Sequence, residues 1–303
     1  MDREWLRCGE MSACLCAPQR ARLRPTSAEL SSGRAKQLGM DVYWLEQNEA
    51  NVPAENDWLS QGEAIRLNGM NFGKRRTDWR LGRWTAKRAL AACLNLPDHR
   101  EVLARIEIRS APSGAPEVYI LNKPAPVAIS LSHCDGAAVC AVAPEGVELG
   151  CDLEMIEPGR DAFLTDYFTV EEQALIARAC AADRPQLFAL LWSAKESALK
   201  ALGTGLRLDP RCVIVSPVEA PGRSHEDAWL EDPTPTFQPS NGLNKWRRLQ
   251  VRHISGEVFH GWWRDDGNLL RTTVADPPPD QPILLEIPIF CHKAPSFPVL
   301  STA

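Results

Sequence analysis

The chain has 303 residues, of which 44% are hydrophobic and 24% charged, and its formal net charge is −5. Such a composition is that of a globular protein with a hydrophobic core of its own. The acidic balance disfavours general nucleic-acid binding, which requires an excess of basic side chains. Because no apolar run is long enough to span a bilayer and the N-terminus lacks the apolar core of a signal peptide, we expect a cytoplasmic protein without membrane or nucleic-acid partners.

Ten cysteines raise the question of disulfide bonds or a zinc site. Cys14 and Cys16 are the closest pair, and no second pair lies near them. Cys93, Cys140 and Cys151 stand singly in apolar stretches, where a free thiol behaves as a small hydrophobic group. We therefore expect reduced, structural cysteines, as is usual in the cytoplasm.

Residues 1–39 lack a sustained hydrophobic period, so we expect a disordered N-terminal extension there and an N-terminal lobe over residues 40–145. The predicted elements of this lobe are, in chain order, a strand at 41–45, a helix at 77–94 and strands at 106–108, 127–131 and 137–142.

A C-terminal lobe is expected over residues 146–276, followed by a Pro-rich tail at 277–303 in which residues 283–285 can lie against the body. Prolines, serines and acidic residues at 217–239 predict an inserted loop. The predicted elements of this lobe are a strand at 147–153, helices at 170–181 and 185–202, and strands at 213–215, 249–251 and 257–263. No internal repeat is apparent, and the mixture of strands and helices predicts an α+β protein in two lobes.

Residues 146–154 alternate apolar and polar side chains as a strand does, which places Asp152 and Glu154 side by side on one face. Neighbouring carboxylates repel each other unless a cation or a shared proton lies between them. Taken alone, the pair is better explained as the solvated face of an edge strand.

A second group of polar residues, Trp192, Glu196 and Lys200, falls on one face of the predicted helix. By itself the Glu196–Lys200 pair would be an ordinary surface ion pair worth a few tenths of a kcal/mol, roughly. Combined with Asp152 and Glu154, however, three carboxylates make a ligand set suited to Mg²⁺ with a substrate phosphate. A lysine beside such an ion suits the charge that develops on a transferred phosphate.

These residues form a longer pattern: Gly-x-Asp-x-Glu at 150–154 and, about forty residues later, Trp-Ser-x-Lys-Glu-Ser-x-x-Lys at 192–200. The pattern resembles the signature of the surfactin-synthetase-activating type of 4′-phosphopantetheinyl transferases. Shorter pieces fit the same family: Ser-Gly-Ala-Pro at 113–116, Ser-His at 132–133 and Phe-Thr-Val-Glu-Glu at 168–172.

The resemblance covers roughly residues 41–215. It departs from the family at Cys151, where an aliphatic residue is usual, and at Ala115, which replaces the lysine of the family's turn. The second departure puts one coenzyme A contact in doubt.

The resemblance implies two similar α/β lobes related by a pseudo-twofold axis, with the active site in the cleft between them. It implies a monomeric enzyme, holo-[acyl-carrier-protein] synthase, that moves phosphopantetheine from coenzyme A to a serine of an apo acyl or peptidyl carrier protein and releases 3′,5′-ADP. The roles it implies are Mg²⁺ ligation by Asp152, Glu154 and Glu196, catalysis by Glu172 as base and Lys200, and coenzyme A contacts by Arg66, Arg109, Ser132, His133, Lys195 and Lys200.

Other interpretations stay open. Glu172 also fits a helix cap with Thr169, and His133 also fits a structural histidine. Clustered carboxylates with a lysine serve Mg²⁺-dependent phosphodiesterases and nucleases too, which would carry a broad basic surface. A non-catalytic module that binds carrier proteins is the third alternative.

Overall fold

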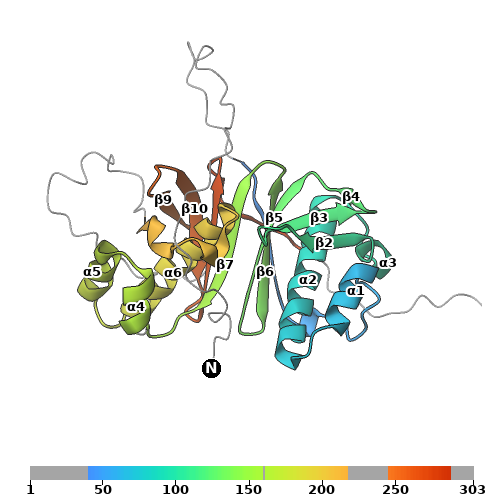
Figure 1. Ribbon diagram of the computed structural model, residues 1–303, viewed down its shortest axis with the longest axis horizontal. Coiled ribbons are helices and arrows are strands. Elements are labelled where there is room, and N and C mark those ends of the chain that lie inside the picture. Colours follow the sequence, from blue (N-terminus) through green and yellow to red (C-terminus); the bar gives the residue numbers. More distant parts are fainter. Residues whose placement is uncertain (1–39, 160, 218–244, 288–303) are drawn as a thin grey trace, which may run out of the picture. The chain divides into compact units, whose positions relative to one another are not determined.

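Three β-sheets and the helices packed on them make up the part of the chain that the computed structural model describes, residues 40–159, 161–217 and 245–287 (Figure 1). The strand orders are β12-β1-β6-β5 in the first half, β7-β11-β10-β9-β8 in the second half, and β2-β3-β4 in a small third sheet. The predicted α+β class is confirmed. No helix among these residues has the length and apolar character needed to cross a bilayer.

The N-terminal lobe holds a long helix on a sheet. Its elements are β1 (Tyr43–Asn48), the 3-10 turn η2 (Glu49–Asn51), α1 (Gln61–Asn68), α2 (Gly73–Cys93), α3 (Arg100–Leu103), β2 (Ile106–Ser110), β3 (Pro116–Ile120), β4 (Lys123–Pro124), β5 (Val127–Cys134) and β6 (Ala137–Pro144). Helix α2 packs on β1, β5 and β6, and apolar side chains such as Trp84 and Leu90 form the core between them.

The C-terminal lobe repeats this plan. Its elements are β7 (Glu148–Met155), α4 (Asp161–Tyr167), α5 (Val170–Arg178), α6 (Arg184–Ala201), the 3-10 turns η3 (Gly205–Arg207) and η4 (Pro210–Cys212), β8 (Val213–Pro217), β9 (Arg247–His253), β10 (Val258–Asp265) and β11 (Leu269–Asp276). The chain then returns to the sheet of the N-terminal lobe as β12 (Ile283–Leu284). Helix α6 packs on β7 and β11, and Gly203 follows it with φ +67°, as expected for a glycine after a helix.

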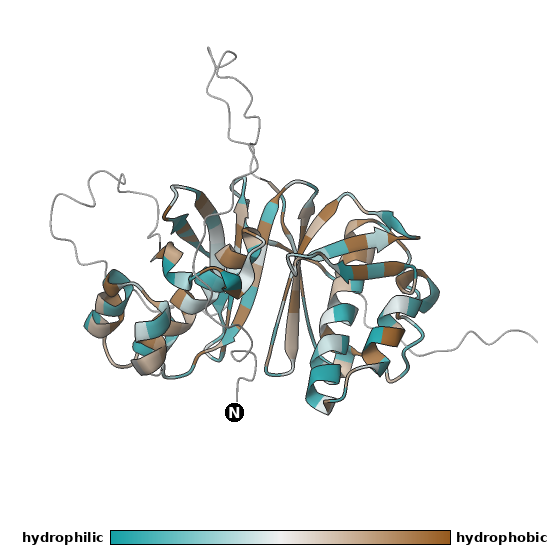
Figure 2. Ribbon diagram, viewed as in Figure 1, coloured by the Kyte–Doolittle hydropathy of each residue, from teal (hydrophilic) through white to brown (hydrophobic). Residues whose placement is uncertain are grey.

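The faces of the two large sheets that carry no helix pack on each other. Trp44 of β1 and Val42 just before it meet Leu149 and Leu153 of β7 in a third apolar cluster, and the Trp44 ring lies edge-on to Trp246 at 5.5 Å. Apolar stretches accordingly run along the central strands, whereas hydrophilic stretches cover the outer turns of α1 and α2 (Figure 2). The predicted lobe boundary at residues 145–146 falls in the turn between β6 and β7.

Two predictions for the C-terminal part need correction. Strand β11 was missed, because Thr272 and Thr273 are both fully buried and the segment does not alternate polar with apolar residues. It lies in the middle of the sheet, between β7 and β10. The tail predicted to begin at residue 277 instead adds strand β12 beside β1, and Leu285 N donates to Trp44 O at 2.8 Å, so residues 283–285 do lie against the body. The extension 1–39 and most of the inserted loop lie outside the described residues.

Candidate active site

Helix α6 and strand β7 approach each other unusually closely. Gly150 faces the helix, and a Cβ atom added there would lie 1.7 Å from the carbonyl oxygen of Ser197. The hydroxyls of Ser193 and Ser197, one helical turn apart, hydrogen-bond Thr272 Oγ1 of β11 at 2.8 and 2.7 Å. Small residues on both elements therefore let the helix lie close to the sheet, and this brings the polar residues of β7 next to those of α6.

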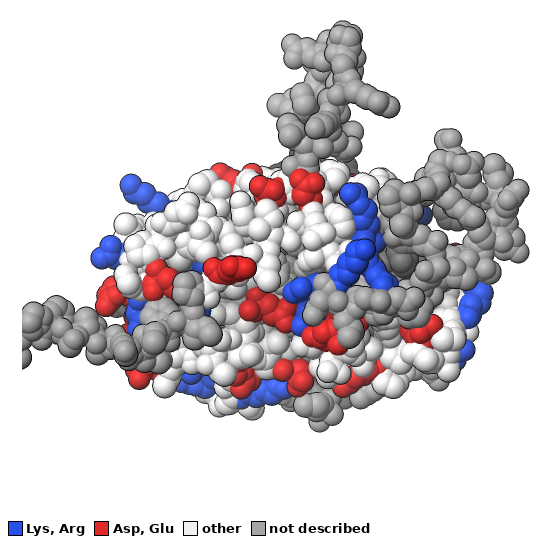
Figure 3. Space-filling model, turned by 180° about the vertical axis from the view of Figure 1, so that it is seen from behind, with Lys and Arg blue, Asp and Glu red and all other residues white. Residues whose placement is uncertain are grey.

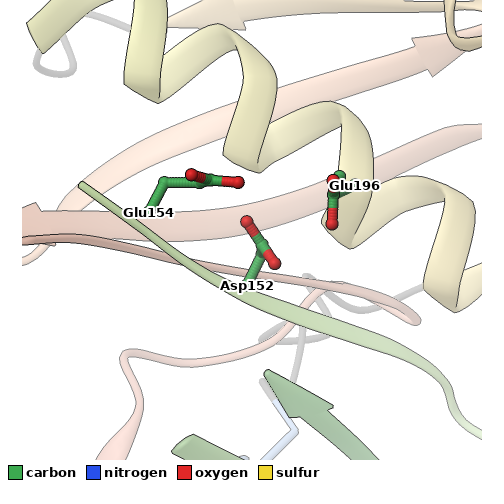
Figure 4. Close-up of side chains that lie close together, drawn as sticks. All are labelled: Asp152, Glu154 and Glu196. Atoms are coloured by element: carbon green, nitrogen blue, oxygen red, sulfur yellow. The ribbon is translucent and has the colours of Figure 1, made fainter. Parts of the chain in front are cut away.

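Three carboxylates meet at this contact. Asp152 and Glu154 extend from β7 and Glu196 from α6, and one oxygen of each lies within 4.8 Å of the others (Figure 4). Asp152 is 1% exposed, and the other two are half-buried. The predicted alternative of a solvated strand face is therefore wrong for Asp152, because α6 covers it.

Neighbouring side chains hold the cluster in place. Asp152 Oδ1 accepts hydrogen bonds from Ser132 Oγ of β5 and from Lys200 Nζ of α6, each at 2.7 Å. Trp192 Nε1 donates to Glu154 Oε1 at 3.0 Å. The second oxygen of Asp152 is buried and has no hydrogen-bond partner among the described residues. A buried acceptor without a donor is costly, and a cation at this oxygen would satisfy it.

Lys200 is the cation of the site. Burial disfavours its charged form, but the carboxylates of Asp152 and Glu196 outweigh burial and raise the pKa of Lys200 above its usual value. Its Nζ lies 2.7 Å from Asp152 and 3.8 Å from Glu196, and it also donates to Cys151 O at 3.0 Å. Lys200 thus stays protonated throughout the neutral range, with 28% of its side chain open to solvent.

The donor set fits a hard divalent ion. Three carboxylates supply oxygen ligands, and Mg²⁺ prefers a few such ligands with positions left for water or phosphate. One of the three, Asp152, is already fixed at one oxygen and open at the other. The structure therefore brings together Asp152, Glu154, Glu196 and Lys200, as the strand and helix periods allow. Ser132, which was expected to contact coenzyme A, lies beside them and hydrogen-bonds Asp152, so its contact with coenzyme A stays a prediction.

The structure contradicts the proposed roles of Glu172 and Lys195. They form a buried ion pair, 2.8 Å between Glu172 Oε2 and Lys195 Nζ, with side chains 2% and 0% exposed. Glu172 also accepts from Val215 N at 3.1 Å and Thr169 N at 2.9 Å. With both oxygens bonded and almost no exposed surface, Glu172 is not placed to take a proton from a substrate. The alternative of a helix cap is confirmed, since Thr169 Oγ1 accepts from Glu172 N.

Lys195 likewise has no surface to offer coenzyme A. Its remaining hydrogen bonds go to the carbonyl oxygens of Pro210 and Val213. Burial lowers the pKa of Lys195, while the Glu172 carboxylate acts in the opposite direction. These contacts are those of an internal structural lysine.

The N-terminal lobe contains the same arrangement, which the sequence analysis missed. Glu63 Oε2 lies 2.5 Å from Lys87 Nζ, Glu63 Oε1 accepts from Ile108 N at 3.1 Å, and Ser60 forms the matching capping box. Lys87 donates to two carbonyl oxygens, as Lys195 does. The signal was present in the sequence: Trp-Thr-Ala-Lys at 84–87 parallels Trp-Ser-Ala-Lys at 192–195. The expectation of no internal repeat was therefore wrong.

The remaining predicted residues lie on the N-terminal lobe. His133 is exposed near the end of β5; partial loss of solvation lowers its pKa, with Asp78 acting in the opposite direction and Lys200 in the same one. Arg66 Nη1 donates to Ser110 Oγ at 3.3 Å, and Arg109 pairs with Glu107 at 2.6 Å. Both arginines contact residues of β2 rather than the acidic cluster, so their assignment to coenzyme A stays a prediction.

A polar pocket of about 620 Å³ opens on the N-terminal lobe, and two residues of its lining, Lys74 and Asp78, act electrostatically on His133. Its lining includes Lys74, Thr77 and Asp78 of α2 and Asp135 of the turn that follows β5. These residues carry no signal in the sequence, because charged residues at the start of a helix are ordinarily solvated.

Known proteins resemble the segment that carries the acidic cluster. Residues 148–249 match the family described as the 4′-phosphopantetheinyl transferase superfamily. The chain is 32% identical over 191 residues to the L-aminoadipate-semialdehyde dehydrogenase-phosphopantetheinyl transferase of Eremothecium gossypii. The matching region covers 60% of the chain and 59% of that protein. It is 24% identical over 188 residues to 4′-phosphopantetheinyl transferase HetI of Nostoc sp., and this match covers 61% of the chain and 77% of that protein.

A solved holo-(acyl-carrier-protein) synthase from Bacillus anthracis, in complex with CoA (3′,5′-ADP), overlaps 35% of the chain and 96% of its own length, with 23% identity and a TM-score of 0.30. The chain spans less than two thirds of the length of the Eremothecium protein. Over residues 148–249, the segment that supplies Asp152, Glu154, Glu196 and Lys200, it matches the 4′-phosphopantetheinyl transferase superfamily.

Proposed function

We propose that the chain transfers the 4′-phosphopantetheine arm of coenzyme A to a serine of an apo acyl or peptidyl carrier protein. The observation that carries this proposal is the cluster of Asp152, Glu154 and Glu196, with Lys200 beside it, inside the segment that matches the superfamily. In the reaction the serine hydroxyl gives its proton to water, its oxygen bonds to the β-phosphorus of the diphosphate, the bond to the bridging oxygen breaks, and 3′,5′-ADP leaves with the electron pair of that bond.

The side chains of the site have separate tasks in this proposal. Asp152, Glu154 and Glu196 would hold Mg²⁺, which when bound neutralises charge on the diphosphate. Ser132 orients Asp152 through Oδ1, which leaves Oδ2 free for the metal. Lys200 offsets the negative charge that the leaving group gains, and most catalysis rests on such positioning and charge stabilisation.

We further infer the surfactin-synthetase-activating type. What supports it is the pair of matching lobes within one chain, each with its buried Glu–Lys pair. His133 and Lys74, of which Lys74 lines the pocket of the N-terminal lobe, are the side chains that we assign to the phosphate-bearing nucleotide end of coenzyme A.

The competing phosphodiesterase or nuclease has less support. It predicts a broad basic surface, because nucleic-acid affinity depends on many phosphate contacts. On the face seen in Figure 3, acidic and basic side chains of the described residues are both scattered over the surface, and the basic ones form a single short row.

Incubation of the purified chain with coenzyme A, Mg²⁺ and a panel of apo carrier proteins tests the proposal. We expect a carrier to gain the mass of one phosphopantetheine arm, and Asp152→Asn or EDTA to abolish the gain. Undiminished transfer in EDTA would refute the metal site. Cleavage of plain DNA or RNA without any carrier modification would favour the phosphodiesterase instead.

A further inference from the structure

We propose that Glu172 and Lys195 are positioning residues: their buried pair fixes the rotation of α6 and thereby holds Glu196 in register with Asp152 and Glu154. The inference rests on the proposed function, because it concerns the metal site of that reaction. It gives the pair a role beyond stability that the equivalent pair in the other lobe does not have.

The argument begins with the neighbouring places of Lys195 and Glu196 on one helix. Successive residues of an α-helix lie about 100° apart around its axis. Lys195 therefore points toward η4, β8 and α5, while Glu196 points toward β7. Any rotation of α6 about its axis moves both side chains together.

Small rotations matter at a metal site. A carboxylate about 5 Å from the helix axis moves by roughly 0.9 Å when the helix turns by about 10°. Metal and catalytic constellations tolerate displacements of only about 0.5 Å. The rotation of α6 must therefore be fixed much more tightly than the packing of an ordinary helix requires.

Two sets of contacts fix it from different sides. On the sheet side, Ser193 and Ser197 bond Thr272, and the bare Cα of Gly150 admits the helix backbone. Lys195 lies two residues from each serine, about 200° around the helix, so it anchors the opposite side.

The anchor itself is rigid because every polar atom in it is bonded. Lys195 donates to Pro210 O and Val213 O, and Glu172 accepts from Val215 N. All these partners belong to η4 and β8, the edge of the same sheet. The pair thus ties α6 to the sheet that carries Asp152 and Glu154.

The N-terminal lobe offers a matched control. Glu63 and Lys87 are 3% and 0% exposed, form the same ion pair and accept or donate the same kinds of backbone hydrogen bond. The residue after Lys87 is Arg88, which pairs with Asp98 and not with a carboxylate cluster. Loss of this pair should cost stability and nothing else.

The experiment compares Glu172→Gln with Glu63→Gln in the full chain. Mn²⁺ serves as the probe, its affinity measured from the electron paramagnetic resonance signal of the free ion, beside the melting temperature. Both variants should melt several degrees lower, since each leaves a lysine buried without its charge partner. Only Glu172→Gln should weaken Mn²⁺ binding, by about tenfold or more, as the loss of an outer-shell partner typically does.

A pair of double variants guards against loss of folding. Replacing both partners by methionine removes the uncompensated charge and keeps the volume, so Glu172→Met/Lys195→Met and Glu63→Met/Lys87→Met should stay folded. The C-terminal double variant should again bind Mn²⁺ about tenfold more weakly, and the N-terminal one normally. Equal Mn²⁺ affinities in either matched pair would overturn the inference, whereas a parent chain that binds no Mn²⁺ would overturn the proposed function itself.

Discussion

The two lobes share the same buried glutamate–lysine pair, and they differ in the residue that follows the lysine. In each lobe a capping-box glutamate pairs with a buried lysine of the long helix. The next residue is Arg88 in α2, which reaches Asp98 at 2.6 Å, and Glu196 in α6, which reaches the acidic cluster. The buried glutamate–lysine pair thus stabilises both lobes. The residue after the lysine is basic in α2 and acidic in α6, and only the acidic one belongs to the candidate metal site.

The strands under the two helices differ in the same way. Below α2, side chains of β1, β5 and β6 such as Leu45, Ile129 and Val142 form an apolar core. Below α6, strand β7 presents Gly150, Asp152 and Glu154. An apolar interface tolerates small shifts of the helix that packs on it. The close approach at Gly150 and the carboxylates of β7, by contrast, allow α6 only one position on the sheet. The comparison therefore predicts that equivalent changes in the two lobes have unequal consequences.

The largest difference in stability between equivalent changes should appear between Gly150→Ala and Gly82→Ala. A methyl group at Gly150 would meet the Ser197 carbonyl at 1.7 Å, and backbone cannot turn away as a side chain can. We expect a loss of about 3 kcal/mol or more in the free energy of unfolding, at the upper end of overpacking effects, with loss of metal binding.

Gly82, in the middle of α2, has no atom within 4 Å of an added Cβ. Alanine there should raise stability by about 0.5–1 kcal/mol, because glycine costs conformational entropy in a helix. Urea unfolding of both variants checks the contrast. A Gly150→Ala protein of parental stability would show that α6 and β7 do not constrain each other.

The second inequality concerns the residues beside the two lysines. Glu196→Gln removes one of three carboxylates that repel one another, so the melting temperature should stay the same or rise slightly. The affinity for Mg²⁺ or Mn²⁺ should fall by more than about a hundredfold, which exceeds the effect of losing an outer-shell partner. Arg88→Gln should do the reverse. It breaks a pair whose guanidinium is 3% exposed, which costs about 1–3 kcal/mol because Asp98 is partly solvated, and leaves the metal alone.

Calorimetric metal titration and thermal melting of the two variants separate these effects. An Arg88→Gln protein that loses metal affinity would break the comparison, since it would mean that the N-terminal lobe also governs the site.

The sequence periods predicted which carboxylates share a face. Alternation in β7 places Asp152 and Glu154 on one side of the strand, the i, i+4 relation in α6 places Glu196 beside Lys200, and the structure brings the three carboxylates together. Their role as metal ligands stays a proposal. The structural role of Glu172 was not predictable in this way, because a capping glutamate and a catalytic glutamate have the same sequence context. Only the burial of the side chain distinguishes them. Its partners, Lys195 and Val215, come from elements that only the fold brings together.

The repeat was overlooked for a related reason. Its few shared residues are separated by segments with no likeness, and only the shared contacts of Glu63 and Glu172 make the match evident. Strand β11 was missed because burial on both faces removes the alternation by which a strand is recognised.

The smallest predicted effect concerns what the N-terminal lobe adds to the site through β5. Partial desolvation lowers the pKa of His133 below its usual value near 6.5, roughly, so the ring of the free protein is mostly neutral at pH 7. A phosphate beside the ring would favour the protonated form and raise that pKa. Binding of coenzyme A should then take up a proton, and its affinity should increase as the pH falls below about 7.

The free protein should respond in the opposite sense. A histidine whose pKa is lower in the folded than in the unfolded state destabilises the fold as the pH falls through the unfolded value. His133→Asn should therefore lose less stability than the parent between about pH 7 and pH 5, the range around the ordinary histidine pKa.

Comparison of coenzyme A with 3′-dephospho-coenzyme A isolates the phosphate. The acidic cluster meets the same diphosphate in both donors, so the difference between their affinities reports His133. We expect His133→Asn to weaken coenzyme A about ten- to a hundredfold, the worth of a charge-assisted hydrogen bond, and to leave the dephospho donor nearly unchanged. Equal losses for the two donors would return His133 to a structural role, and the contribution of β5 to the site would then be Ser132 alone, through its hydrogen bond to Asp152.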